Sequence, residues 1–202
     1  MKALILGYAG TGRELASWLL QEGYAEIQFL DDFKTNPDVV GVIQDWERYG
    51  SCDIFSAIGS YSTMAVRKKI HALIPLSRFS SCFSSASTVL SNNIGSGTVV
   101  FPNSIVSIDA HVGDLNLIYH NCVVSHDVRI GCNSIISNGV VLSGSVQIGN
   151  DSYIGAGSVV IEGKSIGNGC IVAAGSTVVC DVPDNTIYIA PKKMTLNKYW
   201  KL

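Results

Sequence analysis

The sequence predicts two folded parts, an α/β domain over residues 1–80 and a parallel β-helix over residues 81–202. Two nested periods predict the β-helix, and alternating strand and helix patterns predict the α/β domain. Aliphatic residues recur at every sixth position, at Ile94, Val100, Val106, Val112, Ile118, Val124, Ile130, Ile136, Leu142, Ile148, Ile154, Val160, Ile166, Val172 and Val178. Glycines spaced by eighteen follow some of these positions, at Gly95, Gly113, Gly131, Gly149 and Gly167. Because three sixes make eighteen, the expected unit is a triangular coil with three flat faces.

The first eighty residues are expected to form a small parallel sheet with helices on its faces. Strands are predicted at Lys2–Leu6, Glu26–Leu30, Asp53–Ile58 and Ile74–Phe79. One helix is predicted from Glu14 to near Gly23, and a second at Met64–Leu73. Ligands bind beyond the carboxyl ends of the strands in such sheets. The glycine turn that starts at Gly7, the pair Asp31-Asp32 and Gly59 all lie at those ends.

Each coil of the β-helix is expected to fill its interior with two kinds of residue. The aliphatic positions point inward, and most residues two places before them are small: Asn92, Thr98, Ser104, Ala110, Asn116, Cys122, Ser134, Ser152, Ser158, Cys170 and Ser176. The spaced glycines mark a corner where a Cβ is disfavoured. Open solenoid ends need caps, which residues 1–80 and the segment after Asp184 are expected to supply.

The glycine turn suggests an anion site. It reads GxxGxG rather than the dinucleotide pattern GxGxxG, and its N–H groups at a helix start could hold a nucleotide phosphate. Asp31 or Asp32 could accept hydrogen bonds from a ribose or a base. A tight structural turn followed by two solvated acids explains the same residues, so the pattern leaves both interpretations open.

Among the four histidines, His126 is the strongest candidate for chemistry. Asp127 follows it, and a carboxylate beside an imidazole can fix its tautomer and raise its basicity. Gly144 lies eighteen residues on, one coil above, where its N–H could stabilise an oxyanion. A structural surface histidine and a turn glycine are the alternative, and His71 is expected at the surface of its helix.

Composition narrows the functional classes. The net charge of −2 gives no electrostatic reason to expect nucleic-acid binding. No apolar run approaches the roughly 20 residues of a membrane span, and the N-terminus lacks the features of a signal peptide. The six cysteines show no paired spacing, and Cys122 and Cys170 fall on inward positions. We therefore expect a cytoplasmic protein with reduced thiols.

Several motifs together resemble a known family. The segments SHDVRIG at 125–131 and SGSVQIG at 143–149 are similar to those of bacterial hexapeptide-repeat acyltransferases. GYAGTG at 7–12, FLDDF at 29–33 and SAIGS at 56–60 narrow the resemblance to nucleotide-sugar acetyltransferases of the PglD/NeuD type, which include the UDP-4-amino-sugar N-acetyltransferase of bacillosamine synthesis. The resemblance covers nearly the whole chain and implies a Rossmann-like N-terminal domain before a left-handed parallel β-helix.

The resemblance also implies partners and site residues. It implies a homotrimer with sites between neighbouring β-helices, acetyl-CoA as the donor, no metal, and a nucleotide-linked amino sugar as the acceptor, such as a UDP-4-amino-4,6-dideoxy sugar. His126 matches the catalytic base, Asp127 the acid beside it, and Gly144 the glycine at the thioester carbonyl. The nucleotide-sugar site is matched by Ala9, Gly10, Thr11, Asp31, Asp32 and Gly59. Ile135, Gly144, Ala156 and Ala174 match positions around acetyl-CoA.

Three departures from the family pattern concern the same sites. Ile135 stands where the bacillosamine enzyme has a histidine that contacts the acetyl donor, and Thr11 stands where a histidine is common. The usual G-x-P-A-K ending is replaced by the residues from Ile189 to Lys192.

N-acetylation of a nucleotide-activated amino sugar is the leading hypothesis. The sequence leaves three alternatives: O-acetylation of a sugar or sialic acid, a noncatalytic nucleotide-sugar-binding scaffold, and a metalloenzyme that uses His111, His120 and His126.

Overall fold

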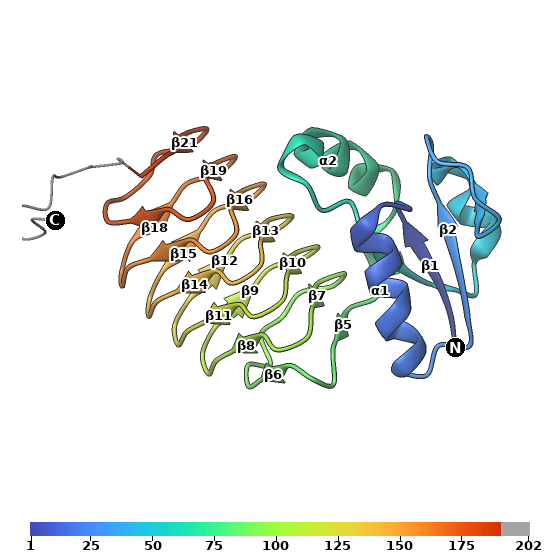
Figure 1. Cartoon of the computed structure of the whole chain (residues 1–202), viewed down its shortest axis with the longest axis horizontal. Coiled ribbons are helices and arrows are strands. Elements are labelled where there is room, and N and C mark those ends of the chain that lie inside the picture. Colours follow the sequence, from blue (N-terminus) through green and yellow to red (C-terminus); the bar gives the residue numbers. More distant parts are fainter. Residues whose placement is uncertain (191–202) are drawn as a thin grey trace, which may run out of the picture.

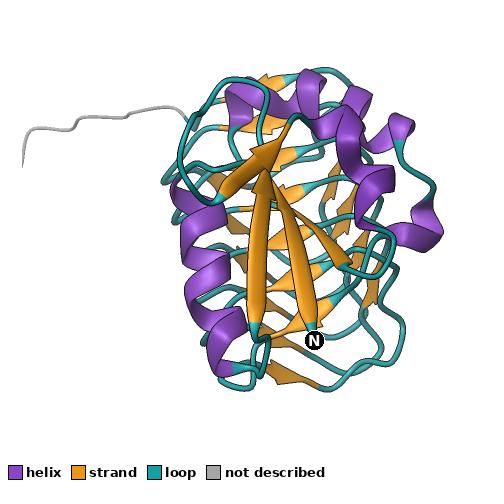
Figure 2. Cartoon of the chain, turned by 90° about the vertical axis from the view of Figure 1, so that its right-hand side faces the viewer, coloured by secondary structure: helices purple, strands orange, loops and turns teal. Residues whose placement is uncertain are grey.

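The computed structural model describes residues 1–190 of the chain, in which an α/β part is stacked on one end of a β-helix (Figure 1). The α/β part contains β1 (Lys2–Leu6), α1 (Gly10–Gln21), β2 (Glu26–Leu30), β3 (Val39–Gly41), β4 (Asp53–Ser56) and α2 (Met64–Leu73). Its four strands are parallel and ordered β3-β2-β1-β4. Viewed toward the end of the solenoid, this sheet lies across the coils (Figure 2).

Two residues of the glycine turn are required by local geometry. Gly7 has a φ of +102°, a conformation that other residues rarely adopt. At Gly12 a Cβ would collide with the Gly7 carbonyl oxygen, because α1 begins close against β1.

The predicted fourth strand at Ile74–Phe79 is wrong. Residues Leu76–Arg78 form a 3₁₀ turn after Pro75, and Phe79 makes a single bridge to Ile54. The fourth strand is β3, a segment of three residues that the sequence pattern did not reveal. Short, half-exposed strands carry little periodicity, so pairing with β2 decides the structure there.

The solenoid has three faces, which we number in chain order. The first face consists of β5 (Cys82–Phe83), β7 (Val99–Val100), β10 (Leu117–Ile118), β13 (Ile135–Ile136), β16 (Tyr153–Ile154), β19 (Ile171–Val172) and β21 (Ile187–Tyr188). The second consists of β6 (Thr88–Val89), β8 (Ile105–Val106), β11 (Val123–Val124), β14 (Val141–Leu142), β17 (Val159–Val160) and β20 (Thr177–Val178). The third consists of β9 (His111–Val112), β12 (Arg129–Ile130), β15 (Gln147–Ile148) and β18 (Ser165–Ile166). The corners between the faces form three edges that run along the solenoid. Each edge takes the number of the face that precedes it in the chain, so the second edge joins the second face to the third.

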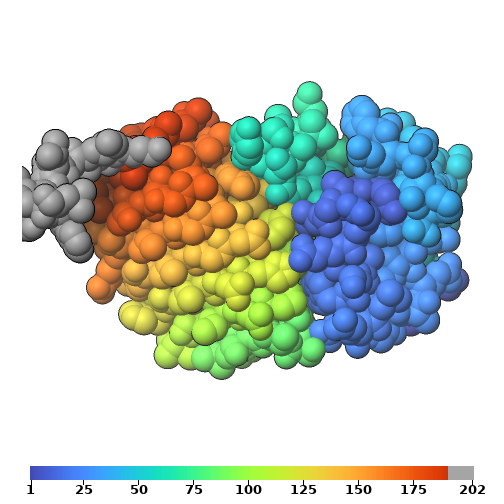
Figure 3. Space-filling model, in the orientation of Figure 1, coloured from blue at the N-terminus to red at the C-terminus, as the bar shows by residue number. Residues whose placement is uncertain are grey.

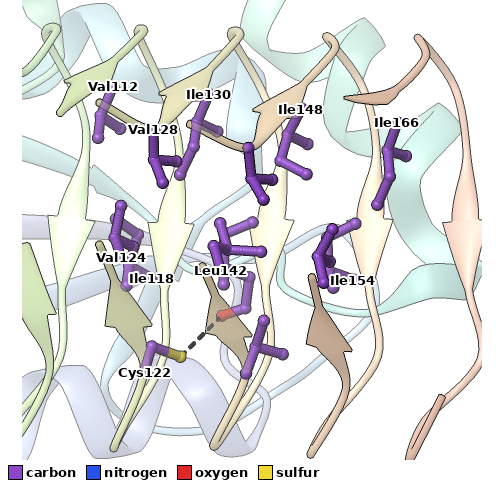
Figure 4. Packing of buried hydrophobic residues seen from close by; sticks show 14 of the residues in the cluster. Val112, Ile118, Cys122, Val124, Val128, Ile130, Leu142, Ile148, Ile154 and Ile166 are labelled. Carbon is purple, nitrogen blue, oxygen red and sulfur yellow. Dashed lines mark hydrogen bonds between the residues drawn. The ribbon is translucent and has the colours of Figure 1, made fainter. Parts of the chain in front are cut away.

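The interior is the predicted aliphatic column (Figure 4). Fourteen of its fifteen positions, from Val100 to Val178, are buried, and Ile94 at the open start is partly buried. Most of the small residues that precede them are also buried, and the Cys122 thiol donates to the Ser137 carbonyl at 3.0 Å. Burial raises the pKa of this thiol to about 11, which keeps it protonated. The fold is the predicted left-handed parallel β-helix.

The period shortens at the last coil. Ile171 pairs with Ile187, sixteen residues on, instead of eighteen. The predicted C-terminal cap begins after Asp184 and the altered family ending begins at Ile189, so both continue past Ala190 and fall partly outside the described residues.

Candidate active site

His126 and Gly144 occupy the same position on successive coils of the second edge. A Cβ placed on Gly144 would lie 2.7 Å from His126 Cε1 and 2.9 Å from His126 Nε2. The imidazole therefore occupies the space that a side chain at position 144 would need, so any residue other than glycine there would displace it. Within residues 1–190 the Gly144 N–H donates to no protein group, so it is available to a bound oxyanion.

Asp127 orients the imidazole. His126 Nδ1 lies 2.8 Å from Asp127 Oδ2, which leaves Nε2 free to accept a proton. Asp127 has a φ of +60°, a conformation that Asp tolerates better than most residues. The two side chains are 58% and 59% exposed, so a single copy of the chain does not shield them from water.

A second site lies in the α/β part, at the carboxyl ends of β1, β2 and β4. It is a cavity of about 210 Å³, and its lining includes five of the six predicted nucleotide-sugar residues: Ala9, Thr11, Asp31, Asp32 and Gly59. The sixth, Gly10, begins α1 and is exposed beside the cavity. The first N–H groups of α1 lack intrahelical partners and can bind an anion there.

The two acids of this cavity have different roles. Asp31 accepts hydrogen bonds from the backbone N–H groups of Tyr8, Phe33 and Lys34 at 2.7–2.9 Å. Its carboxylate thus shapes the turn, which is the structural alternative left open by the sequence. Asp32 accepts from the Ile43 N–H through Oδ1, at 2.9 Å, and its second oxygen has no partner among the described residues. Asp32 is therefore the better candidate for a ligand contact.

The cavity is joined to the first edge of the β-helix. Thr11 Oγ1 lies 2.8 Å from the Tyr119 hydroxyl, which donates to the Gly59 carbonyl at 3.1 Å. Next to Tyr119, His120 lies 3.3 Å from Glu14 on α1. Both contacts place the cavity of the α/β part beside this edge.

Comparison with known proteins identifies the chemistry. Residues 145–180 match the bacterial transferase hexapeptide (six repeats) family. The acetyltransferase domain of PglB from Neisseria gonorrhoeae is 30% identical, with a TM-score of 0.79 over 92% of this chain and 95% of that one. A search of curated protein sequences finds no significant match.

Two further solved structures are similar. A histidine-to-alanine variant of GDP-perosamine N-acetyltransferase from Caulobacter crescentus, in complex with CoA and GDP-perosamine, is 27% identical, with a TM-score of 0.79 over 93% of this chain and 92% of that one. WeeI from Acinetobacter baumannii is 22% identical, with a TM-score of 0.78 over 93% of this chain and 96% of that one, and supports the fold. The chain belongs to the hexapeptide-repeat nucleotide-sugar acetyltransferases.

The acetyltransferase places the expected acetyl-CoA residues in three locations. Gly144 lies on the second edge, under His126. Ala156 and Ala174 lie on the first edge, at the other border of the second face. Ile135 is completely buried on the first face, in the core shared with the α/β part. In a single copy its side chain packs between the two parts, and its place at the acetyl donor stays a prediction.

The prediction that His71 lies on the surface is wrong. His71 is buried, and its ring nitrogens lie 2.7 Å from Ser56 Oγ and 2.9 Å from Asn133 Oδ1. Burial lowers its pKa to about 3, with a further contribution from Arg67.

The other three histidines, His111, His120 and His126, do not lie close together. His111 lies on the third face, whereas His120 and His126 lie on different edges of the acetyltransferase. Within residues 1–190, no group of three His, Cys, Asp or Glu side chains is arranged to hold a metal ion. No helix in the same range is long and apolar enough to cross a membrane.

Sequence reasoning missed Arg67 and Tyr119, both of which contact the cavity wall. Tyr119 is an outward residue at the first edge, and Arg67 lies in a helix that also carries Lys68 and Lys69. The eighteen-residue spacing of Asn133 and Asp151, polar residues at one corner, was the available signal for a surface on which this helix docks.

Proposed function

We propose that the protein transfers an acetyl group from acetyl-CoA to the amine of a nucleotide-linked amino sugar, with His126 as the general base. The observation that carries the proposal is the position of His126 Nε2, which lies 2.9 Å from where a Cβ of Gly144 would stand, next to a glycine whose N–H donates to no group within residues 1–190. The nucleotide cavity supports the acceptor class. The PglB domain was solved with acetyl coenzyme A and the perosamine enzyme with CoA and GDP-perosamine, which supports both substrates.

The proposed reaction needs no covalent enzyme intermediate. The amine nitrogen attacks the thioester carbonyl while His126 Nε2 takes its proton, and the Gly144 N–H stabilises the oxyanion. The C–S bond then breaks as the amide forms, and the CoA thiolate leaves and takes the proton from the imidazolium. Asp127 holds the imidazole in the tautomer that can accept at Nε2.

We further propose a homotrimer in which the second faces surround the threefold axis. Large apolar side chains that are at least one-third exposed follow this face and its edge: Leu90, Ile105, Ile108, Ile161 and Val179. Exposed apolar side chains along one face and its edge favour association. In a threefold ring, the second edge of each copy lies beside the first edge of the next. His126 of one copy would then serve the nucleotide cavity of its neighbour, and both would be shielded from water.

Purified protein incubated with acetyl-CoA tests the proposal. UDP- and GDP-linked amino sugars are compared with the corresponding hydroxy sugars and with sialic acid, and CoA release is measured with the mass of the product. We expect transfer to an amino sugar. Preferred transfer to a hydroxyl would identify the O-acetyltransferase alternative, and nucleotide-sugar binding without turnover would identify the scaffold.

Substitution of the base tests the role of His126. His126→Ala should lower kcat by about 10²–10⁴-fold, the usual contribution of a general base, without changing the oligomeric state. Gly144→Ala should also lower kcat, because its Cβ displaces the imidazole. The control is His111→Ala, an exposed histidine on the third face, which should retain full turnover. Near-normal kcat in His126→Ala would contradict the assignment.

A further inference from the structure

Helix α2 docks on the third edge through residues that repeat every eighteen positions. Leu115, Asn133 and Asp151 occupy this corner on successive coils, with φ values of +58°, +58° and +56°. Arg67 bonds Leu115 and Asn133, and His71 bonds Asn133. Lys68 forms an ion pair with Asp151 at 2.6 Å. The space-filling view shows α2 in direct contact with the solenoid (Figure 3).

Arg67 is the largest completely buried side chain at this contact. Its Nε donates to Asn133 Oδ1 at 2.9 Å, and its Nη2 donates to the Leu115 carbonyl. On the other side, its Nη1 donates to the Ile58 carbonyl at 2.7 Å. Burial lowers the pKa of Arg67 to about 10, so the guanidinium remains charged at neutral pH.

The surrounding bonds fix the position of this guanidinium. Asn133 Oδ1 accepts from both Arg67 and His71, while the Asn133 amide donates to Asp151 at 2.7 Å. The Ser56 hydroxyl donates to His71 Nε2 and accepts a 3.4 Å contact from Arg67 Nη1. Each polar atom of the network has a partner, so the buried charge is held in one geometry.

The Ile58 carbonyl belongs to a wall of the nucleotide cavity. The segment 57–60 lines the cavity directly after β4, and α2 contributes Val66 and Ile70 to the same lining. Arg67 therefore connects this wall to two successive coils of the β-helix. In the proposed function, the glycine turn and the start of α1 would bind the phosphate end of the nucleotide, and the Arg67 bonds join the 57–60 wall to the solenoid.

We propose that Arg67 is a positioning residue, which sets the 57–60 wall so that a bound nucleotide sugar presents its amine at the height of His126. The inference rests on the proposed function, because it assigns the cavity to the acceptor. Arg67 does not touch the reacting atoms. Without its bonds the wall should loosen, which weakens binding of the nucleotide sugar and leaves acetyl-CoA binding unchanged.

Two variants of the full-length protein test this role, with a neighbouring residue as control. Arg67→Lys keeps the charge but loses the three-way donor geometry. Asn133→Gly keeps Arg67 and removes its side-chain acceptor on the solenoid, and glycine already occupies this corner at Gly97 and Gly169. Lys68→Ala removes the adjacent ion pair between α2 and the same edge without touching the wall.

The readouts separate positioning from general stability. In Arg67→Lys and Asn133→Gly, we expect amide exchange of residues 57–60 to rise by about tenfold or more, as for loss of one charged hydrogen bond. KM for the nucleotide sugar should rise with it, KM for acetyl-CoA should stay constant, and Lys68→Ala should change neither. If amide exchange at residues 57–60 were the same in Arg67→Lys and Asn133→Gly as in the control Lys68→Ala, the proposal would be overturned. Failure of the wild type to transfer acetyl would contradict the proposed function, whereas the exchange measurement would still decide the role of Arg67.

Discussion

At the scale of single residues, His71 couples stability to pH. Its pKa falls to about 3 in the folded protein, against about 6.5 in an unfolded chain. Between these values the unfolded state binds more protons, so the stability contributed by neutral His71 is complete above about pH 6.5 and is lost as the pH falls. The expected slope is at most about 1.4 kcal/mol per pH unit.

Urea unfolding between pH 7.5 and 4.5 measures this slope. The variant His71→Gln should show a smaller loss of stability over the same range, because it does not titrate. His111→Ala provides the control, since His111 is exposed and should leave the slope unchanged. Equal slopes in the wild type and His71→Gln would show that His71 is not the coupled group.

At the scale of elements, the glycines spaced by eighteen keep adjacent coils in contact. A Cβ on Gly131 would lie 2.9 Å from the Asn150 backbone nitrogen and 2.9 Å from the Gly149 carbonyl carbon. Gly131→Ala must therefore separate two coils, and we expect a loss of about 1–3 kcal/mol, as for other overpacked sites. Thermal and urea unfolding measure the loss.

Gly139→Ala is the matched control for this prediction. Gly139 has a φ of +68° but no atom within 4 Å of a Cβ, so alanine there encounters backbone strain without a clash. We expect a cost of about 1–2 kcal/mol from the left-handed conformation alone. If Gly131→Ala did not lower the free energy of unfolding, the adjacent coils would be able to move apart at no cost, which would contradict this prediction.

The elements also show which features a sequence can reveal. The aliphatic column was predicted because every coil repeats the same steric demand, and the spacing placed His126 on Gly144. β1, β2 and α2 were predicted with their observed bounds. The burial of His71 and Ile135 was not, because it depends on how two parts with separate patterns pack together. The use of Asp31 within its own turn likewise depends on backbone geometry that residue type alone does not fix.

At the scale of the whole molecule, the proposed trimer would shield His126 and Asp127, whose side chains are 58% and 59% exposed in a single copy. Val141→Asp would place a charge at the centre of the second face, where the proposed copies meet, and burial of an unpaired charge is strongly unfavourable. We expect the mass measured by sedimentation equilibrium to fall from trimer to monomer, with loss of acetyl transfer and with secondary structure retained. Gln147→Asp on the exposed third face is the control and should remain trimeric. A wild-type protein that sediments as a monomer would contradict the proposed assembly.

The docking of α2 on three stacked corners has a consequence for how such a chain can change in length. An insertion or deletion of one residue within the coils would turn every later side chain to the wrong face. Removal of a whole coil would leave the inward and outward pattern of the other coils unchanged. Coils that carry Leu115, Asn133 and Asp151 are tied to the α/β part, so a lost unit there would also detach a helix. We therefore expect such chains to gain or lose whole coils at the far end, which leaves the distance from the cavity of the α/β part to His126 unchanged.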